Sequence, residues 1–202
     1  MHFVLASLSH VPQVTELIRT ENRTSLLSRL GRRFLSKYFL PDLINDPDAR
    51  LFIAEANGEV VGYVAFVIPD EVLTTTLWKH KWSMLASILQ NPHRAPRILC
   101  DIFLHAFLAF YHIEVERETL HGVARLVLMG VRRDFQSKGV GQALLQHCFG
   151  TDPNLQSTPI LVDTDTQRAA TFYERNGFKR IGWEPRWMYK NLILLRGLAV
   201  PQ

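Results

Sequence analysis

The sequence predicts an α/β fold, in which a mixed central β-sheet is flanked by helices. In the second half of the chain, β-rich runs alternate with amphipathic segments, an order typical of parallel strands joined by helical crossovers. In the first half, the dipeptide Asn57-Gly58 joins two β-rich runs and favours a tight antiparallel hairpin. Together these patterns predict one sheet with both kinds of pairing.

Length and composition are those of a globular protein. Of the 202 residues, 47% are hydrophobic and 21% charged, which excludes collagen-like, disordered and coiled-coil chains. The length suits one domain, and we expect a single domain over residues 1–202. The net charge of +4 tolerates an anionic ligand but is too small to indicate nucleic acid, so we expect no nucleic-acid partner.

Two helices are predicted in the first half of the chain. Ser9 or His10 caps the first, which has Pro12 in its first turn, where proline is favoured. The second covers about residues 25–39, with apolar side chains at helical spacing, and Pro41 closes it. Strands are expected at 2–6, 51–56 and 60–68.

The second half continues the sheet after an interruption. Strands are expected at 125–131 and 159–162, and each precedes a helix, at 139–149 and at about 167–176. Between the third and fourth strands lies a largely apolar stretch, about residues 70–121. Because this stretch is longer than an ordinary connection and has apolar residues at helical spacing, we interpret it as a helical insertion.

The turn after the fourth strand carries the clearest chemical signal. Gly139 and Gly141 let the backbone curl tightly and turn successive N–H groups outward, and the start of a helix adds further donors. Such a turn suits a diphosphate. A Walker loop needs Gly-Lys-Ser/Thr at its end and a dinucleotide fingerprint needs a third glycine, so neither fits. Taken alone, the two glycines fit ordinary turn chemistry equally well.

Two motifs in order resemble those of the GNAT superfamily of acetyl-CoA-dependent N-acetyltransferases. Gln136-x-x-Gly139-x-Gly141 resembles its acetyl-CoA signature, and the segment 169–178, with Tyr173 four residues before Gly177-Phe178, resembles its later helix. The runs 60–63 and 187–190 are similar to the entry of its third strand and to its last strand. The resemblance implies a GNAT-like mixed sheet with the insertion between the third and fourth strands.

The resemblance also implies acetyl-CoA as co-substrate, without a metal. The main chain of Met129 and Val131 would pair with the pantetheine arm, which the fourth and fifth strands would splay apart to admit. Thr166 stands where many relatives have an asparagine that contacts this arm, and its hydroxyl either replaces one hydrogen bond or caps the helix. The pyrophosphate would be held by the backbone N–H groups of Gln136, Ser137, Lys138, Gly139, Val140 and Gly141.

The implied reaction is direct acyl transfer. A neutral amine attacks the thioester, a backbone N–H near Val131 stabilises the oxyanion, and Tyr173 protonates the leaving thiolate as general acid. No nucleophilic serine or cysteine is needed, and the chain has no Gly-x-Ser-x-Gly elbow. An aromatic residue at the spacing of Tyr173 also suits a core position.

The general base is the main departure from the family pattern. Arg125 lies roughly where relatives often carry a glutamate. The upstream candidates are Glu114, Glu116, Glu118 and His121, each of which equally suits a solvated surface, and a water chain is a further alternative. Arg132 and Arg133 either add positive charge near the CoA phosphates or belong to the solvated surface.

We therefore expect an N-acetyltransferase that acetylates a primary amine of a small-molecule or sugar acceptor. The alternative is a non-catalytic acyl-CoA-binding regulatory or scaffold protein. Residues 78–82, which are aromatic and basic, leave a membrane contact open as a lesser alternative, and a homodimer also stays open. Because Cys100 and Cys148 form neither a disulfide framework nor a metal site, and the apolar run 3–8 is too short for a signal peptide, we expect a cytoplasmic protein.

Overall fold

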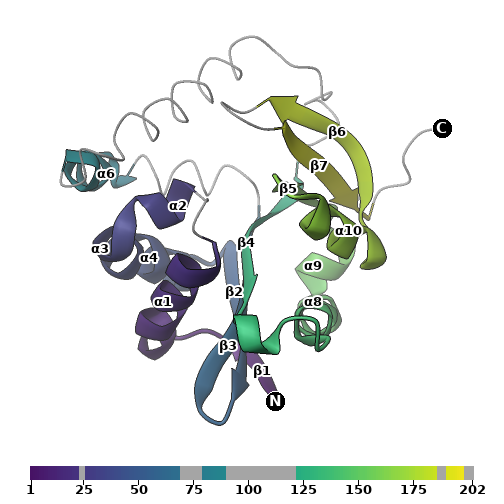
Figure 1. Cartoon of the computed structure of the whole chain (residues 1–202), viewed down its shortest axis with the longest axis horizontal. Coiled ribbons are helices and arrows are strands. Elements are labelled where there is room, and N and C mark those ends of the chain that lie inside the picture. The colour runs from purple at the N-terminus through teal and green to yellow at the C-terminus, as the bar shows by residue number, and fades with distance from the viewer. Residues whose placement is uncertain (23–25, 69–78, 90–121, 186–189, 198–202) are drawn as a thin grey trace.

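A seven-stranded mixed sheet forms the centre of the molecule (Figure 1). The computed structural model of the chain describes residues 1–22, 26–68, 79–89, 122–185 and 190–197. The strands lie in the order β1-β2-β3-β4-β5-β7-β6, and among these described strands only β4 and β5 pair in parallel. Their bounds are β1 His2–Leu5, β2 Ala49–Ala56, β3 Glu59–Val67, β4 Ala124–Val131, β5 Ile160–Thr164, β6 Lys179–Pro185 and β7 Lys190–Arg196. The mixed sheet predicted from the sequence is confirmed.

Helices cover both faces of the sheet and create two cores. One face carries α1 Val11–Glu21, α2 Leu26–Arg29, α3 Gly31–Phe34 and α4 Leu40–Asn45, and the other carries α8 Val140–Thr151, α9 Pro153–Ser157 and α10 Gln167–Arg175 (Figure 1). Alternate strand residues enter the two cores, as the pleat requires. Ile53 lies in the α1 core and Phe52 in the α8 core, where Cys148 is also buried and burial raises the pKa of its thiol.

Two local expectations need correction. His10 is the N-cap residue of α1, as one alternative had it, but its side chain makes no capping bond and instead accepts a hydrogen bond from Ser7 N. The second helix does not end at Pro41. A π-helical turn at Leu35–Phe39 leads directly into α4, whose first turn contains Pro41. The helical backbone is continuous there, since Leu40 N donates to Leu35 O of the π-helical turn, and it runs through Pro41 to Asn45. The elements α9 and β6 were not predicted from the sequence.

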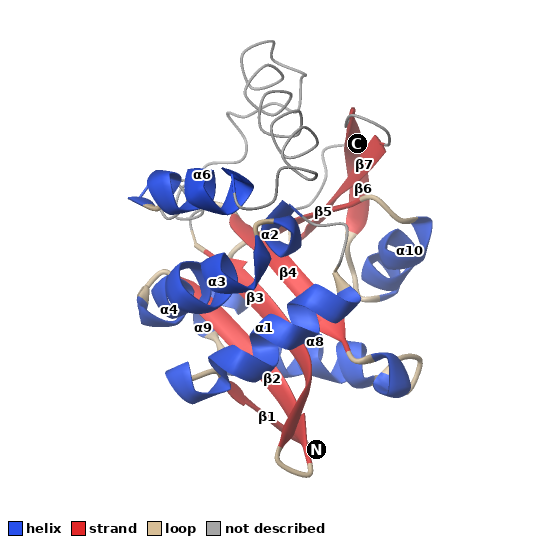
Figure 2. Cartoon of the chain, turned by 60° about the vertical axis from the view of Figure 1, so that its left-hand side comes forward, coloured by secondary structure: helices blue, strands red, loops and turns tan. Residues whose placement is uncertain are grey.

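Two predicted segments are described only in part. Of the insertion, residues 79–89 are described and include α6 Lys81–Leu89, which lies beside α3 (Figure 2). Asp42 of α4 accepts hydrogen bonds from Lys79 Nζ at 2.9 Å and His80 Nε2 at 2.7 Å, and these bonds hold the start of the segment. Residues 70–78 and 90–121 lie outside the described residues, so the extent of the insertion stays a prediction. The last strand begins at Lys190, and residues 187–189 also lie outside.

A β-bulge in β4 sets which side chains face each core. Ala65 of β3 pairs with Leu128 and Phe66 pairs with Leu126, so Val127 is the extra residue. Leu126 therefore enters the α8 core while Leu128, two residues later, enters the α1 core. In a regular strand these two side chains would share a face.

β4 and β5 separate beyond the bulge. The two strands pair only from Ala124 with Ile160 to Leu126 with Val162, whereas β4 continues to Val131. The carboxyl-terminal half of β4 thus has β3 on one side and no strand on the other within the described chain. This is the splay between the fourth and fifth strands that the sequence resemblance implied.

Tyr63 packs its ring directly on the backbone of Gly130 in the neighbouring strand. A Cβ atom at Gly130 would stand 2.7 Å from Cε1 and from the hydroxyl oxygen of Tyr63. Tyr63 is fully buried, so its ring has little room to move away. The two residues form a hydrogen-bonded pair of the antiparallel ladder, which places them opposite each other.

We expect Gly130→Ala to destabilise the fold by about 1–3 kcal/mol because the added methyl group overpacks the Tyr63 ring. The urea midpoint measures the change. Gly150→Ala is the matched control, because a Cβ at Gly150 of α8 would meet nothing within 4 Å, and it should be neutral or stabilising. Equal midpoints for Gly130→Ala and the wild type would contradict the close approach.

Candidate functional site

The open edge of β4 presents main-chain groups to the gap left by β5. Arg132 N donates to Val61 O, and directions alternate along an antiparallel ladder, so the N–H and C=O groups of Met129 and Val131 point away from β3. Asn22 Nδ2 donates to Met129 O at 3.0 Å, and Gln136 Nε2 donates to Val131 O at 2.8 Å. An extended chain with amide groups can pair with this edge as an added strand does.

The turn that follows β4 has the form expected of an anion cradle. Ser137 and Gly139 both have left-handed backbone angles, with φ of 59° and 78°. Left-handed residues between ordinary ones turn successive N–H groups toward one side. A non-glycine residue in this region is mildly strained, and such strain is concentrated at functional sites.

α8 begins directly after this turn without a capping side chain. Its N-cap residue is Gly139, and the first main-chain bond of the helix runs from Ala143 N to Gly139 O. The N–H groups of Val140 and Gly141 have no partner within the helix. By contrast, Asp152 caps α9 and Thr166 caps α10. The start of α8 therefore keeps its donors and its positive dipole end for an anion.

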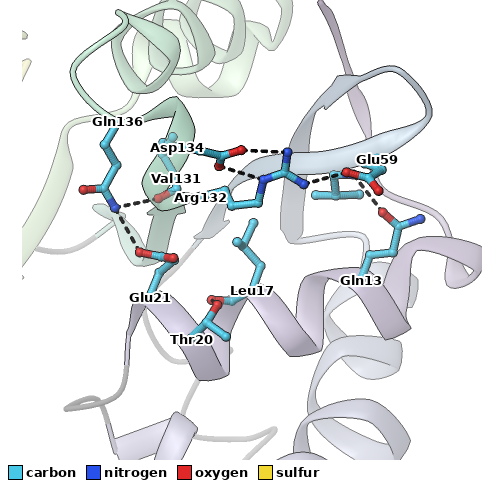
Figure 3. A network of polar contacts seen from close by, with 10 residues as sticks. Gln13, Leu17, Thr20, Glu21, Glu59, Val131, Arg132, Asp134 and Gln136 are labelled. Atoms are coloured by element: carbon cyan, nitrogen blue, oxygen red, sulfur yellow. Dashed lines mark hydrogen bonds and ion pairs between the residues drawn. The ribbon is translucent and has the colours of Figure 1, made fainter.

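The side chain of Gln136 joins three elements around the open edge (Figure 3). Its Nε2 donates to Val131 O and also, at 2.9 Å, to Glu21 Oε2 at the end of α1. Its Oε1 accepts from Arg168 Nη2 of α10 at 3.3 Å. The residue that begins the glycine-rich turn thus connects both helical layers with β4.

Arg132, the residue after β4, bonds Asp134 just before the glycine-rich turn and Glu59 of β3 (Figure 3). Its guanidinium makes two bonds to Asp134, at 2.8 and 3.1 Å, and a third to Glu59 Oε2 at 2.6 Å. The hydrogen bonds from Arg132 lower the pKa of Asp134. Arg132 therefore pairs with two carboxylates of its own chain, while Arg133 is exposed.

A Schellman motif fixes Tyr173 at the end of α10. Phe178 N donates to Tyr173 O and Gly177 N donates to Glu174 O, both at 3.1 Å, and Gly177 has a φ of 89°. The rings of Phe178 and Tyr173 pack edge to face with centroids 5.4 Å apart. The spacing of Tyr173 and Gly177-Phe178 thus has a physical cause, because glycine ends the helix and phenylalanine packs back on the tyrosine.

Tyr173 and Tyr63 are both buried and lie close enough to influence each other. Burial, and then the charge of Asp163, raise the pKa of Tyr173 above its ordinary value of 10.0. Burial, and then the ionised forms of Tyr173 and Glu21, raise the pKa of Tyr63. Both hydroxyls therefore stay protonated in the folded protein and can act as donors.

Arg125, at the position where a base was sought, is part of an ionic cluster. Its Nη1 lies 3.1 Å from Asp163 Oδ1, and Asn191 Nδ2 donates to Asp163 Oδ2 at 3.0 Å. The four upstream candidates for the general base, at 114, 116, 118 and 121, lie outside the described residues. Thr166 Oγ1 accepts from Ala169 N at 3.2 Å, so the capping interpretation is confirmed.

Sequence reasoning missed the polar side chains that the structure brings to the open edge, namely Glu21, Asn22, Tyr63 and Arg168. Asn22 Nδ2 also donates to Tyr63 Oη at 2.8 Å, across 41 residues of sequence. Glu21 and Gln136 are separated by 115 residues. No spacing rule relates residues this far apart, and the one visible signal was Tyr63 in the quoted strand motif.

No group of three or more His, Cys, Asp and Glu side chains in the described part of the chain is arranged to hold a metal ion. None of the helices in the described ranges has the length and apolar character needed to span a membrane.

Comparison in sequence identifies one family. Residues 12–178, which are most of the chain, match the family described as Acetyltransferase (GNAT) family. No curated protein matches the chain in sequence.

Solved acetyltransferase structures share the fold over the whole chain. PaiA N-acetyltransferase from Thermoplasma acidophilum, in complex with coenzyme A, has a TM-score of 0.61 at 13% identity and covers 98% of this chain and 100% of its own. A Corynebacterium glutamicum structure has a TM-score of 0.60 at 16% identity and covers 98% of this chain and 97% of its own. It is named "histone acetyltransferase HPA2 and related acetyltransferase". Aminoglycoside 6'-acetyltransferase type Ii has a TM-score of 0.58 at 13% identity and covers 100% of this chain and 99% of its own. At these identities the likeness is one of fold.

We expect Gly139→Ala to weaken binding of coenzyme A about tenfold, or about 1.4 kcal/mol, because the left-handed turn relaxes and its N–H groups lose their common direction. The rise in melting temperature on adding coenzyme A measures this. Gly122→Ala is the matched control, since Gly122 has a φ of 77° and equally open surroundings but lies before β4. Both variants should lose similar stability, and an equal loss of ligand response in both would contradict the role of the turn.

Proposed function

Because this chain belongs to the GNAT acetyltransferase family, and is thus an acyltransferase, we propose that it moves the acetyl group of acetyl-CoA to a primary amine of a small-molecule or sugar acceptor. The observation that carries the proposal is the open edge of β4, which leads directly into a left-handed turn and an uncapped helix start. An edge that pairs amides and a turn that binds a diphosphate suit the two parts of a pantetheine–pyrophosphate cofactor.

The binding residues follow from this arrangement. The N–H groups of residues 136–141 hold the pyrophosphate, and the outward N–H and C=O groups of Met129 and Val131 pair with the pantetheine arm. Thr166 uses its oxygen to cap α10, but a hydroxyl both donates and accepts, so its hydrogen stays available for the arm. Lys138 is exposed beside the turn and adds positive charge near the phosphates.

The chemistry is direct attack of the amine on the thioester carbonyl. The new C–N bond forms as the carbonyl oxygen becomes an oxyanion, which an outward N–H of the β4 edge near Val131 stabilises. The C–S bond then breaks, and Tyr173 gives its proton to the leaving thiolate. Because burial keeps Tyr173 protonated, it is available as an acid throughout the neutral pH range.

The acceptor class is proposed from the surroundings of the edge. Glu21 brings a carboxylate to the α1 side of β4, which suits a cationic amine. α6 lies beside α3 on the same layer of helices and adds to the wall on that side. The relatives in fold differ in acceptor, since one is named for histones and another for aminoglycosides.

One observation favours a second candidate, a binding protein without turnover. Arg125 occupies the position of the family's glutamate and pairs with Asp163, so no base stands there.

Release of free thiol from acetyl-CoA distinguishes the acetyltransferase from the binding protein. Kanamycin, glucosamine, spermidine and a hexapeptide with an N-terminal alanine serve as acceptors. Release with a small amine or amino sugar supports the proposal. A melting-temperature rise with coenzyme A but no release with any acceptor supports the binding protein, and release with the peptide alone overturns the acceptor class.

We expect Tyr173→Phe to lower kcat for thiol release about 100-fold while leaving the melting-temperature response to coenzyme A unchanged, because only the proton donor is removed. Tyr38→Phe is the control, since Tyr38 packs against His80, away from the β4 edge. In the wild type, kcat should not fall between pH 7 and pH 9, because the pKa of Tyr173 is raised above 10.0. An unchanged kcat in Tyr173→Phe would remove this tyrosine from the mechanism.

A further inference from the structure

We propose that Glu21 binds the ammonium group of the acceptor and takes the proton that the amine must lose before it attacks. This inference rests on the proposed acetyl transfer. It names a general base in place of the family's glutamate, whose position Arg125 occupies.

Glu21 is linked to the open edge of β4 through one intervening side chain, that of Gln136. It is the last residue of α1, and its Oε2 accepts from Gln136 Nε2 at 2.9 Å (Figure 3). The same nitrogen donates to Val131 O at 2.8 Å, so one amide group lies between the carboxylate and the open main chain of β4.

The next residue continues along the same edge. Asn22 Nδ2 bonds both Met129 O at 3.0 Å and Tyr63 Oη at 2.8 Å. The end of α1 therefore follows β4 from Val131 to Met129, the stretch that pairs with the arm carrying the thioester. The ionised carboxylate of Glu21 also contributes to the raised pKa of Tyr63, after burial and Tyr173, so its charge acts on the Tyr63 hydroxyl.

The charge of Glu21 has no cation to balance it among the described residues. Its hydrogen-bond partner is a neutral amide, whereas Glu16 pairs with Arg19, Glu59 with Arg132 and Asp163 with Arg125. Tyr63 on β3 interacts with the charge of Glu21, while Arg168 on α10 bonds Gln136 through the other atom of its amide, Oε1. A half-buried carboxylate in this setting is complementary to an ammonium group.

Two side chains carry the proton transfers, with Glu21 as base and Tyr173 as acid. Glu21 takes one proton from the bound ammonium ion and later passes it to water. The neutral amine attacks the carbonyl carbon, and the C–S bond breaks as Tyr173 protonates the sulfur. The second amine proton, lost as the tetrahedral intermediate collapses, replaces the one that Tyr173 gave. The products are the acetamide and the free thiol of coenzyme A, with one proton released.

The test compares Glu21→Gln and Glu21→Asp with the wild type, using acetyl-CoA and whichever of kanamycin, glucosamine and spermidine the wild type acetylates. Glutamine keeps the hydrogen bond to Gln136 through its amide oxygen but cannot take a proton. Glu21→Gln should lower kcat/KM about 100-fold, because the amide cannot take the proton, and Glu21→Asp should recover part of the rate. Hydroxylamine, which is uncharged at neutral pH, should be acetylated at similar rates by all three proteins.

Glu16→Gln is the matched control, because Glu16 lies on the same helix in an exposed pair with Arg19. It should leave transfer unchanged. The melting-temperature response to coenzyme A should be the same in every variant. An active wild type whose rate persists in Glu21→Gln overturns the role of Glu21 alone, as does an equal loss with hydroxylamine. A wild type that binds coenzyme A but releases no thiol with any amine overturns the proposed function, and the role of Glu21 falls with it.

Discussion

The separation of β4 from β5 is the constraint on which the rest of the site depends. A strand inside a sheet uses all its main-chain groups for pairing, so it has none for a ligand. Here β5 leaves β4 after Leu126, and the remaining residues of β4 keep one side open. Since the bulge at Val127 lies at the same point, the strand changes which face its side chains occupy where the open edge begins. The main-chain groups that no strand pairs with thus lie within the sheet, between β4 and β5, as well as at the outer strands β1 and β6.

The side chains around this edge satisfy it and connect it to both helical layers. Asn22 and Gln136 donate to the carbonyls of Met129 and Val131, which would otherwise be buried polar groups without a partner. Because Gln136 also bonds Glu21 and Arg168, the turn proposed to hold the pyrophosphate is linked by hydrogen bonds to α1 and α10. A carbonyl oxygen can accept two bonds, so these side chains do not prevent an added strand from pairing.

Local sequence predicted those parts of the site that depend on neighbouring residues. Gly139 needs a left-handed backbone, and Gly177 ends α10 so that Phe178 packs on Tyr173. Both features arise within a few residues of the chain, so they are visible as motifs, and the resemblance to the GNAT signatures gave those motifs their expected roles. Pro41 shows the limit of such rules, because the helical backbone runs from the π-helical turn before it through Pro41 to Asn45. Strand β6 was missed because its pairing with β7 is set by the sheet and not by a pattern of its own.

By itself, the sequence determined the α/β class, the order along the chain of the strands β1 to β5, and the glycine-rich turn. These features follow from periodicity and turn chemistry, which act over a few residues. Tyr173 at the end of α10 was singled out by the resemblance of its motif to that of the GNAT family. Only the tertiary structure decided that Glu21, Asn22 and Tyr63 meet at the open half of β4, and that Arg125 is neutralised by Asp163. Those contacts join residues far apart in the chain, and they depend on strand register, the bulge and the divergence of two strands, none of which a local pattern encodes.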